Sequence, residues 1–418
     1  MDSGSTAWIL TSAALVTLMF PGLAFYYGGM TGFKTTLNML MMVSGAFCVV
    51  VVAWVVIGHS ISFGNSYGGA GLLGNVTEYI GIKGMLPDDP NGLPPYLVVA
   101  FMSIFAALTT CIVGGVAADR IKFVSWLIFA GAWVILVYGP VAHWVFAFDS
   151  EDGSYVGGWI ANKLGAIDFA GGTAVHINSG AAGLALCLLL GVRRSWNRPP
   201  RPHSLPFVLL GAMLLWAGWY GFNGGSALAS GNNAGVALAN THFAAAAATL
   251  GWVITEKIRD KHATALGAAS GMVTGLVAIT PACGAVNGVG ALILGATSGV
   301  LCAYGVTWKR KLGYDDSLDV VGIHFLGGIF GTLMIGMLAV PDAPNGGTGL
   351  FYGGGFGLLG KQALAAVAVI AYSFCVSYAI GWVIKKTIGL RVSPDDEDAG
   401  LDLVIHAERA YEIPVGVE

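Results

Sequence analysis

Eleven long apolar segments recur along this chain, each close to the roughly 20 residues that an α-helix needs to cross a bilayer. Of the 418 residues, 56% are hydrophobic and only 10% are charged, well below the quarter that is usual in soluble domains. We therefore predict an all-α, polytopic membrane protein. The expected spans lie near residues 7–29, 38–63, 95–117, 122–148, 169–191, 206–225, 235–256, 263–279, 287–307, 320–340 and 361–384.

The distribution of Lys and Arg predicts the orientation of these spans. With the amino terminus outside, seventeen of the twenty basic residues fall in cytosolic segments, and only Lys83, Lys163 and Lys361 remain outside. Cytosolic loops of membrane proteins carry such an excess of positive charge. One missed or invented span would have destroyed the alternation of basic and non-basic loops along the chain. The bias therefore also supports the count of eleven spans. We expect a multi-pass protein of the cell membrane with its carboxyl terminus in the cytosol.

An odd number of spans in each half gives the two halves opposite topologies. Spans one to five (7–192) and six to ten (206–340) then form an inverted repeat, with an eleventh helix at 361–384 outside it. Transporters commonly have this plan, with the substrate site at the interface of the repeats. We predict a transmembrane transport domain over residues 1–385 and a cytosolic tail over 386–418.

Two histidines, His176 and His324, lie in equivalent spans of the two halves. At 1.5 Å per helical residue, His176 is about 12 Å below Asp168, and His324 is about 7.5 Å from Asp319 on the opposite side. The two side chains are therefore predicted to meet near the midplane. An ionisable residue at this depth usually marks a pathway or a proton relay, although each histidine alone fits a hydrogen-bonded core position equally well.

The sequence does not favour an enzyme or a cofactor protein. Six cysteines lie in apolar segments without the spacing of a disulfide framework or a zinc site. A string resembling a phosphate-binding loop at 355–362 lacks the Ser or Thr after its lysine and follows no predicted strand. We expect no catalytic residues, cofactor, metal or nucleic-acid partner.

The segment DFAGGTAVHINSGAAG at 168–183 closely resembles the signature of the ammonium transporter family. Further similar stretches are PGLAFYYGGM at 21–30, GWYGFNGGSAL at 218–228, VVGIH at 320–324 and the tail at 389–411. The resemblance covers nearly the whole chain in order. It implies transport of ammonium and methylammonium across the lipid bilayer, and nitrogen uptake by the cell.

The resemblance also implies an outer vestibule that holds an ammonium ion against aromatic rings and a serine hydroxyl. The matching residues are Trp219, Ser226 and, in the fourth span, Phe146, where many relatives have tryptophan. Since tryptophan offers the best cation–π face, we expect a weaker outer site unless Trp144 contributes instead.

Below this vestibule, Phe105 and Phe222 match two stacked phenylalanines that close the pore in the family. Without the resemblance, aromatic residues at helical spacing would be assigned to the core. Asp168 matches an acid that supports the site through backbone contacts, and its position also fits a helix N-cap.

These residues predict that ammonium loses its proton at the phenylalanine gate and crosses as ammonia, because a bare charge at the bilayer centre costs at least about 2.5 kcal/mol. His176 and His324 would act either as hydrogen-bonding stepping stones or as a relay for the released proton. A Rhesus-like ammonia gas channel and an ammonium sensor with residual transport are the alternatives.

The tail is acidic at 395–398 and by composition would be a solvated end. The family resemblance instead implies that it packs beneath the membrane and touches a neighbouring subunit of a homotrimer. It further implies a possible PII-type signal protein as a partner at the cytosolic face.

Overall fold

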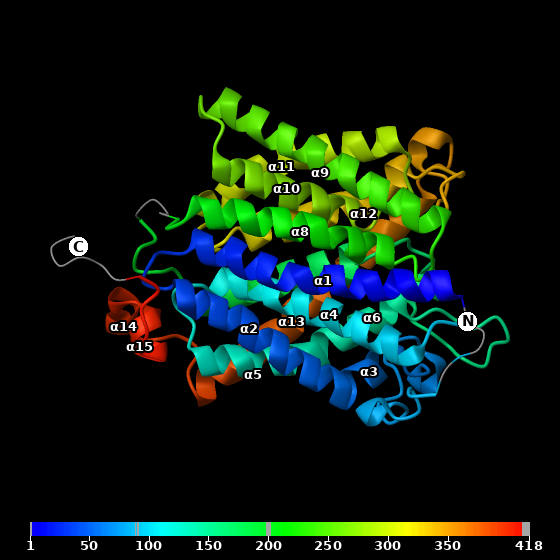
Figure 1. Cartoon of the computed structure of the whole chain (residues 1–418), viewed down its shortest axis with the longest axis horizontal. Helices are drawn as coiled ribbons and strands as arrows, with labels where there is room; N and C mark the ends of the chain where they lie inside the picture. Colours follow the sequence, from blue (N-terminus) through cyan, green and yellow to red (C-terminus); the bar gives the residue numbers. More distant parts are fainter. Residues whose placement is uncertain (1, 88, 90–91, 198–201, 412–418) are drawn as a thin grey trace.

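The computed structural model describes residues 2–87, 89, 92–197 and 202–411, and every regular element in these ranges is helical. The helices run roughly parallel to one axis (Figure 1). The amino terminus lies at one end of this bundle, which we call the N-terminal face. The short helices α14 and α15 lie at the other end, which we call the tail face. Residues 412–418 of the predicted tail lie outside the described residues.

Ten helical stretches in the described ranges are long and apolar enough to cross a membrane. Several combine an α-helix with a π or 3₁₀ segment. They are α1 (Ser3–Met30); α2 (Thr36–Ala53) with η1 (Trp54–Gly58) and α3 (His59–Phe63); α4 (Pro95–Gly114) with η4 (Gly115–Ala117); α5 (Phe123–Trp133) with η5 (Val134–Tyr138) and α6 (Gly139–Phe146); η7 (Gly172–Ile177) with α7 (Asn178–Leu190); α8 (Leu205–Gly225); α9 (Asn232–Arg259); α11 (Gly288–Leu312); η8 (Val321–Phe325) with α12 (Leu326–Leu338); and α13 (Gly357–Thr387).

The predicted eighth span is the short helix α10 (Ala265–Ile279). Its 15 residues reach only about 22 Å at 1.5 Å per residue. The helix is surrounded by α8, α9, α11 and α12. After it, the chain turns at Pro281, whose carbonyl oxygen accepts a hydrogen bond from the backbone N–H of Phe169 at 3.1 Å.

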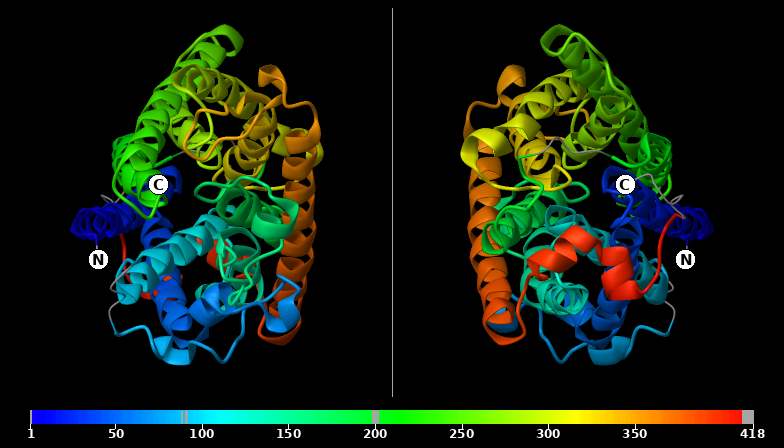
Figure 2. Two further views of the ribbon diagram at one scale, coloured as in Figure 1. Left: turned by 90° about the vertical axis from the view of Figure 1, so that its right-hand side faces the viewer. Right: turned by 90° about the vertical axis from the view of Figure 1, so that its left-hand side faces the viewer.

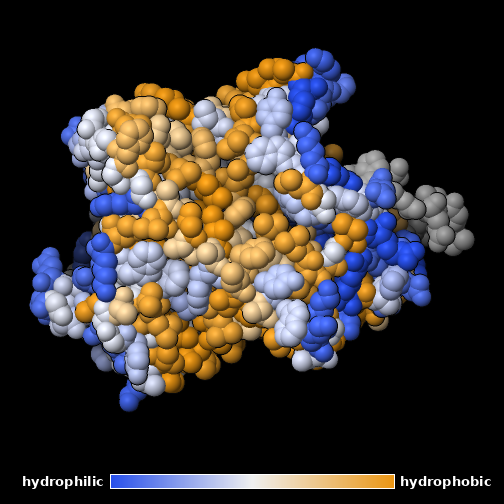
Figure 3. Space-filling model, turned by 180° about the vertical axis from the view of Figure 1, so that it is seen from behind, coloured by the Kyte–Doolittle hydropathy of each residue, from blue (hydrophilic) through white to orange (hydrophobic). Residues whose placement is uncertain are grey.

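A space-filling view shows an apolar band between two polar ends (Figure 3). The band contains outward-facing side chains such as Leu250, Ile254 and Val367, each more than half exposed. A surface of this kind requires an apolar solvent, which confirms the prediction of an all-α, multi-pass membrane protein.

The first helices of the two predicted halves, α1 and α8, pack antiparallel along their length. Glycines make this contact possible. A methyl group at Gly211 would lie 2.3 Å from the backbone nitrogen of Tyr26, and one at Gly22 would lie 3.0 Å from that of Leu215. Small residues allow such close backbone contact between membrane helices.

The helix α1 lies at one side of the bundle, and α13 runs along the opposite side (Figure 2). Beyond α13, the helices α14 (Pro394–Ala399) and α15 (Leu401–His406) lie across the tail face. Asp402 accepts a hydrogen bond from the backbone N–H of Asn38 at 2.7 Å, and Arg391 pairs with Glu397 at 2.7 Å. This part of the tail is thus folded against the bundle.

Candidate functional site

Two histidines meet in the middle of the bundle. His176 lies on η7 and His324 on η8, and their Nδ1 atoms are 3.2 Å apart. Their ring centroids are separated by 5.3 Å with an interplanar angle of 28°. Both residues are buried, at 1% and 3% exposure. The structure thus brings together the two side chains that the sequence predicted to meet.

Close approach of the two helices brings these rings together. A methyl group at Gly180 would lie 2.4 Å from Cβ of Phe325, and one at Gly328 would lie 3.0 Å from Cβ of His176. Each histidine also sits on a π-helical turn, a local departure from the α-helix that is frequent at functional sites. Larger residues at either glycine would push the helices, and with them the imidazoles, apart.

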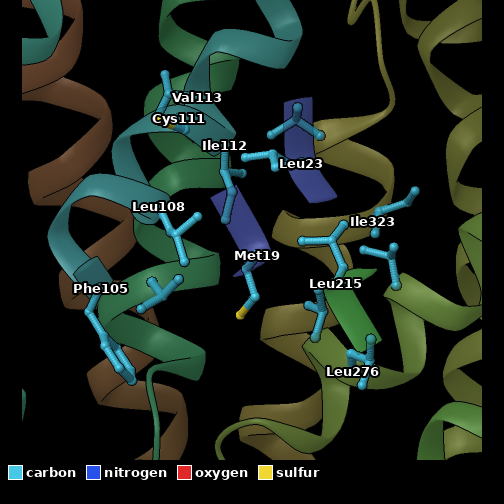
Figure 4. Packing of buried hydrophobic residues seen from close by; sticks show 14 of the residues in the cluster. Met19, Leu23, Phe105, Leu108, Cys111, Ile112, Val113, Leu215, Leu276 and Ile323 are labelled. Atoms are coloured by element: carbon cyan, nitrogen blue, oxygen red, sulfur yellow. The ribbon is translucent and has the colours of Figure 1, made fainter. Parts of the chain in front are cut away.

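The histidines border a small apolar lumen of about 20 Å³. This volume is close to the minimum that holds one water-sized molecule. The buried side chains around it converge from α1, α4 and α8, as the sticks for Met19, Leu108 and Leu215 show (Figure 4). The lumen is lined by Met19, Leu23, Leu108, Ile112, Val175, His176, Leu215, Trp219, Phe222, Val273 and His324.

Trp219 does not lie where we expected it. The structure places it in the wall of the lumen, stacked on His176 with ring centroids 5.5 Å apart. Its Nε1 donates to the Thr280 hydroxyl at 2.9 Å, which fixes the indole in this orientation. The helix α8 continues for six more residues after Trp219 and ends at Gly225 near the N-terminal face. Trp219 therefore lies one to two helical turns below that face. It therefore faces the histidine rather than the entrance.

Phe105 and Phe222 stack face to face above the lumen. Their ring centroids are 4.0 Å apart with an interplanar angle of 17°, and both are essentially buried. Phe101 packs on Phe105 at 5.0 Å from the preceding turn of α4. Phe222 lines the lumen, and Phe105 lies on the side of the stack away from it.

On the other side of the stack is a pocket of about 220 Å³, which we call the entrance pocket. Four predicted site residues line it: Phe105, Phe146, Asp168 and Ser226. The Ser226 hydroxyl donates to the carbonyl oxygen of Phe222 at 2.8 Å, so its oxygen retains free lone pairs. Trp144 does not contribute, because it packs against Trp159 and Tyr372 instead.

Asp168 supports the site through the backbone. One carboxylate oxygen accepts hydrogen bonds from the N–H groups of Gly171 at 2.8 Å and Gly172 at 2.7 Å. The other accepts from the Thr173 N–H at 2.7 Å and from the Thr173 hydroxyl. These donors are the otherwise unpaired N–H groups at the start of η7. Asp168 therefore acts as the helix cap that positions His176.

A family model described as the Ammonium Transporter Family matches residues 7–411. The chain belongs to the ammonium transporter family. An ammonium transporter of Mycobacterium tuberculosis (strain H37Rv) is 52% identical over 438 residues, which cover 99% of this chain and 91% of that protein. As its relatives are, the protein is a membrane transporter and not an enzyme.

Solved structures of ammonium transporters have the same fold. Mep2 from Saccharomyces cerevisiae is similar with a TM-score of 0.87 and 31% identity, over 100% of this chain and 93% of that one. A structure titled Sensor Amt Protein has a TM-score of 0.86 and 28% identity, over 96% and 98% of the two chains.

Sequence reasoning missed several residues of this ammonium transporter's entrance pocket. Phe148, Phe169, Asn233 and Asn345 also line it. Asn345 belongs to the loop after α12, and its N–H donates to the carbonyl oxygen of Gly284 at 2.9 Å. Phe169 belongs to the family-like segment at 168–183, whereas the only sequence signal for Phe148, Asn233 and Asn345 was their position near the ends of predicted spans.

On the tail-face side of the bundle, Asp316 mirrors Asp168. Its carboxylate accepts from the N–H groups of Val320 at 3.1 Å and Val321 at 2.7 Å, at the start of η8. Burial raises the pKa of Asp316 to about 6.

Next to Asp316, Arg193 pairs with Asp315 at 2.9 Å and with Asp119 at 3.0 Å. Burial opposes the charge on Asp315, but its hydrogen bonds with Arg193 outweigh burial and lower its pKa.

The other membrane histidines have structural contacts, as expected. Nδ1 of His143 lies 3.1 Å from the carbonyl oxygen of Ser62, and Nδ1 of His242 lies 2.7 Å from the Tyr220 hydroxyl. His59 packs among aromatic rings, including those of Trp54 and Phe63. None of these three lines the lumen or the entrance pocket.

Proposed function

We propose that ammonium binds in the entrance pocket, loses its proton at the Phe105–Phe222 stack and crosses the lumen as ammonia. The observation that carries this proposal is the buried His176–His324 pair beside a small apolar cavity. A charged ion in such a site costs at least about 2.5 kcal/mol, whereas neutral ammonia can donate to and accept from imidazole. Reprotonation then follows at the tail face.

Selectivity follows from the same geometry. Potassium has no proton to release, so it would have to enter the closed apolar lumen as a bare ion. The aromatic rings of Phe105 and Phe146 attract a cation at the entrance, an interaction worth about 0.5 to 2 kcal/mol. This energy recruits ammonium without trapping it. Ammonium and potassium are therefore distinguished at the deprotonation step and not when they first bind.

We further propose that the histidine pair relays the released proton. A neutral imidazole has one donor and one acceptor nitrogen, so the 3.2 Å contact pairs the N–H of one Nδ1 with the lone pair of the other. Each ring then keeps its Nε2 for a second partner, and Nε2 of His176 is buried without one among the described residues. A proton can therefore enter on one ring and leave from the other.

The orientation is part of the proposal. The positive-inside bias supports a cell-membrane protein with the N-terminal face, and hence the entrance pocket, outside. The family resemblance supports a homotrimer and binding of a PII-type signal protein at the tail face. Cross-linking and mass measurement of the purified protein in detergent test the trimer.

Uptake of labelled methylammonium by the purified protein in liposomes, with and without an electrical potential, tests the function. We expect saturable uptake that equimolar potassium does not inhibit. The variant His242→Ala is a matched control, because His242 lies outside the pore, and it should transport normally. Potassium conduction at a comparable rate would refute the proposal, and non-saturable flux would favour a Rhesus-like gas channel.

A sensing role is a second candidate, because the similar structure titled Sensor Amt Protein shares this fold. A sensor would bind ammonium in the entrance pocket without sustained flux. The liposome assay distinguishes transport from sensing, because binding of ammonium without uptake indicates a sensor.

A further inference from the structure

The entrance pocket is much larger than the ammonium ion that we propose for it. Its volume is about 220 Å³, whereas the lumen beyond the Phe105–Phe222 stack has a volume of about 20 Å³. The smaller volume holds one water-sized molecule, and ammonia is of that size. The entrance pocket therefore has room for a cation with several carbon atoms, which is too large for the lumen.

Aromatic rings line the entrance pocket from three parts of the chain. Phe105 belongs to α4, and Phe169 precedes η7. Phe146 is the last residue of α6, and Phe148 follows two positions later. Phe148 is 64% exposed, so its ring is accessible to a ligand that enters the pocket. Aromatic rings that surround a cavity are the usual means by which proteins recognise quaternary ammonium ions.

The carboxylate of the pocket suits a cation that has no N–H groups. Both oxygens of Asp168 already accept hydrogen bonds, from backbone N–H groups at residues 171–173 and from the Thr173 hydroxyl. These donors fill the roughly four lone-pair sites of a carboxylate. An N–H group that leaves water needs an acceptor, whereas a quaternary ammonium ion has no N–H group and needs none.

The loop that carries Phe148 is acidic. Asp149, Glu151 and Asp152 follow this ring in the chain and are exposed. None of the three pairs with a basic side chain among the residues that the structure describes. Carboxylates beside a cleft raise the local concentration of cations. This attraction acts on a methylated ammonium ion as it does on ammonium.

We infer that the entrance pocket binds small quaternary ammonium ions, with Phe148 as part of its aromatic wall, and that these ions inhibit transport because the lumen does not admit them. Tetramethylammonium has five non-hydrogen atoms around one positive charge, so it fits the pocket and exceeds a lumen that holds one water-sized molecule. The inhibition rests on the proposed function, whereas the binding does not.

Tetramethylammonium chloride is the probe in two measurements. Equilibrium binding of labelled tetramethylammonium to the purified protein in detergent reports on the pocket without any transport. In proteoliposomes, we expect tetramethylammonium to raise the KM for methylammonium, to leave the maximal rate unchanged and not to be taken up itself. The uncharged molecule tert-butanol has a similar shape and should neither bind nor inhibit.

Three variants test the role of the aromatic wall. Phe148→Ala should weaken the binding of tetramethylammonium about two- to fivefold, as for the loss of one partly exposed ring. Phe148→Trp should strengthen the binding, because tryptophan offers a better cation–π face. Phe351→Ala is the matched control and should leave binding unchanged. Phe351 is 65% exposed in the short helix η9 (Leu350–Tyr352) and does not line the entrance pocket.

The inference is overturned if tetramethylammonium binds no better than tert-butanol, or if Phe148→Ala and Phe351→Ala weaken its binding equally. Uptake of tetramethylammonium at a rate comparable to that of methylammonium would overturn its exclusion by the lumen. Binding of tetramethylammonium to a protein that takes up no methylammonium would support this site and overturn the proposed function instead.

Discussion

Nδ1 of His324 lies 3.2 Å from Nδ1 of His176, although 148 positions separate the two residues in the chain. Their contact joins the two predicted halves of the chain at the wall of the apolar lumen. The contact depends on backbone approach at Gly180 and Gly328. The pair therefore links the packing of the helices directly to the proposed path of the proton.

Replacing one member of the pair should separate proton movement from ammonia movement. In His324→Ala the relay is interrupted, while the lumen becomes wider and remains apolar. We expect the charge carried per methylammonium to fall by at least tenfold, with flux largely retained, as measured by current and labelled uptake in the same liposomes. If current and flux decrease in proportion, the histidines serve as stepping stones instead.

The stacked rings of Phe105 and Phe222 should control which species enters the lumen. The double variant Phe105→Ala/Phe222→Ala removes the closure and opens a path for hydrated ions. We expect potassium to inhibit methylammonium uptake in this variant but not in the wild type. Phe101→Ala, which removes a ring beside the stack, is the control and should keep the selectivity. Unaltered potassium exclusion in the double variant would place the barrier elsewhere.

Asp168→Asn should weaken the start of η7 and not the binding of the substrate. The amide would present an N–H₂ group to backbone donors, and each lost charged hydrogen bond is worth about 1.5 to 3 kcal/mol. We expect a lower melting temperature and maximal rate, with little change in KM. A raised KM at normal stability would show that Asp168 contacts ammonium directly.

The Arg193–Asp315 pair should stabilise the tail face. Asp315→Asn leaves a buried guanidinium with only Asp119 as an acidic partner, so we expect a loss of about 3 kcal/mol in the free energy of unfolding. The exposed pair of Arg194 and Asp398 provides the comparison, and Asp398→Asn should cost less than about 1 kcal/mol. Equal effects of the two substitutions, measured by thermal unfolding in detergent, would contradict the structure.

Asp316 should make stability depend on pH in a defined window. Its folded pKa of about 6 lies above the unfolded value of about 3.9, so the folded state binds more protons between these two values. Relative to Asp316→Asn, the wild type should gain stability as pH falls from about 6 to 4, by roughly 2 to 3 kcal/mol. Above pH 6 the difference in the free energy of unfolding between the wild type and Asp316→Asn should be constant. If this difference does not change with pH anywhere in the range, the carboxyl group titrates normally.

Sequence information alone determined the all-α class, the approximate spans and the family, because helix length, hydropathy and motifs are local properties. It also predicted the meeting of His176 and His324, since topology and rise per residue place both near the midplane. Four predicted residues do line the entrance pocket: Phe105, Phe146, Asp168 and Ser226.

Only the tertiary structure decided how deep each side chain lies and what it contacts. Trp219 and Ser226 are seven positions apart on or just after one helix, yet the first stacks on His176 and the second lines the entrance pocket. Asn233 and Asn345 come from distant segments, and no local pattern marks them. Such positions depend on how closely helices pack, which is set by contacts between residues far apart in the chain.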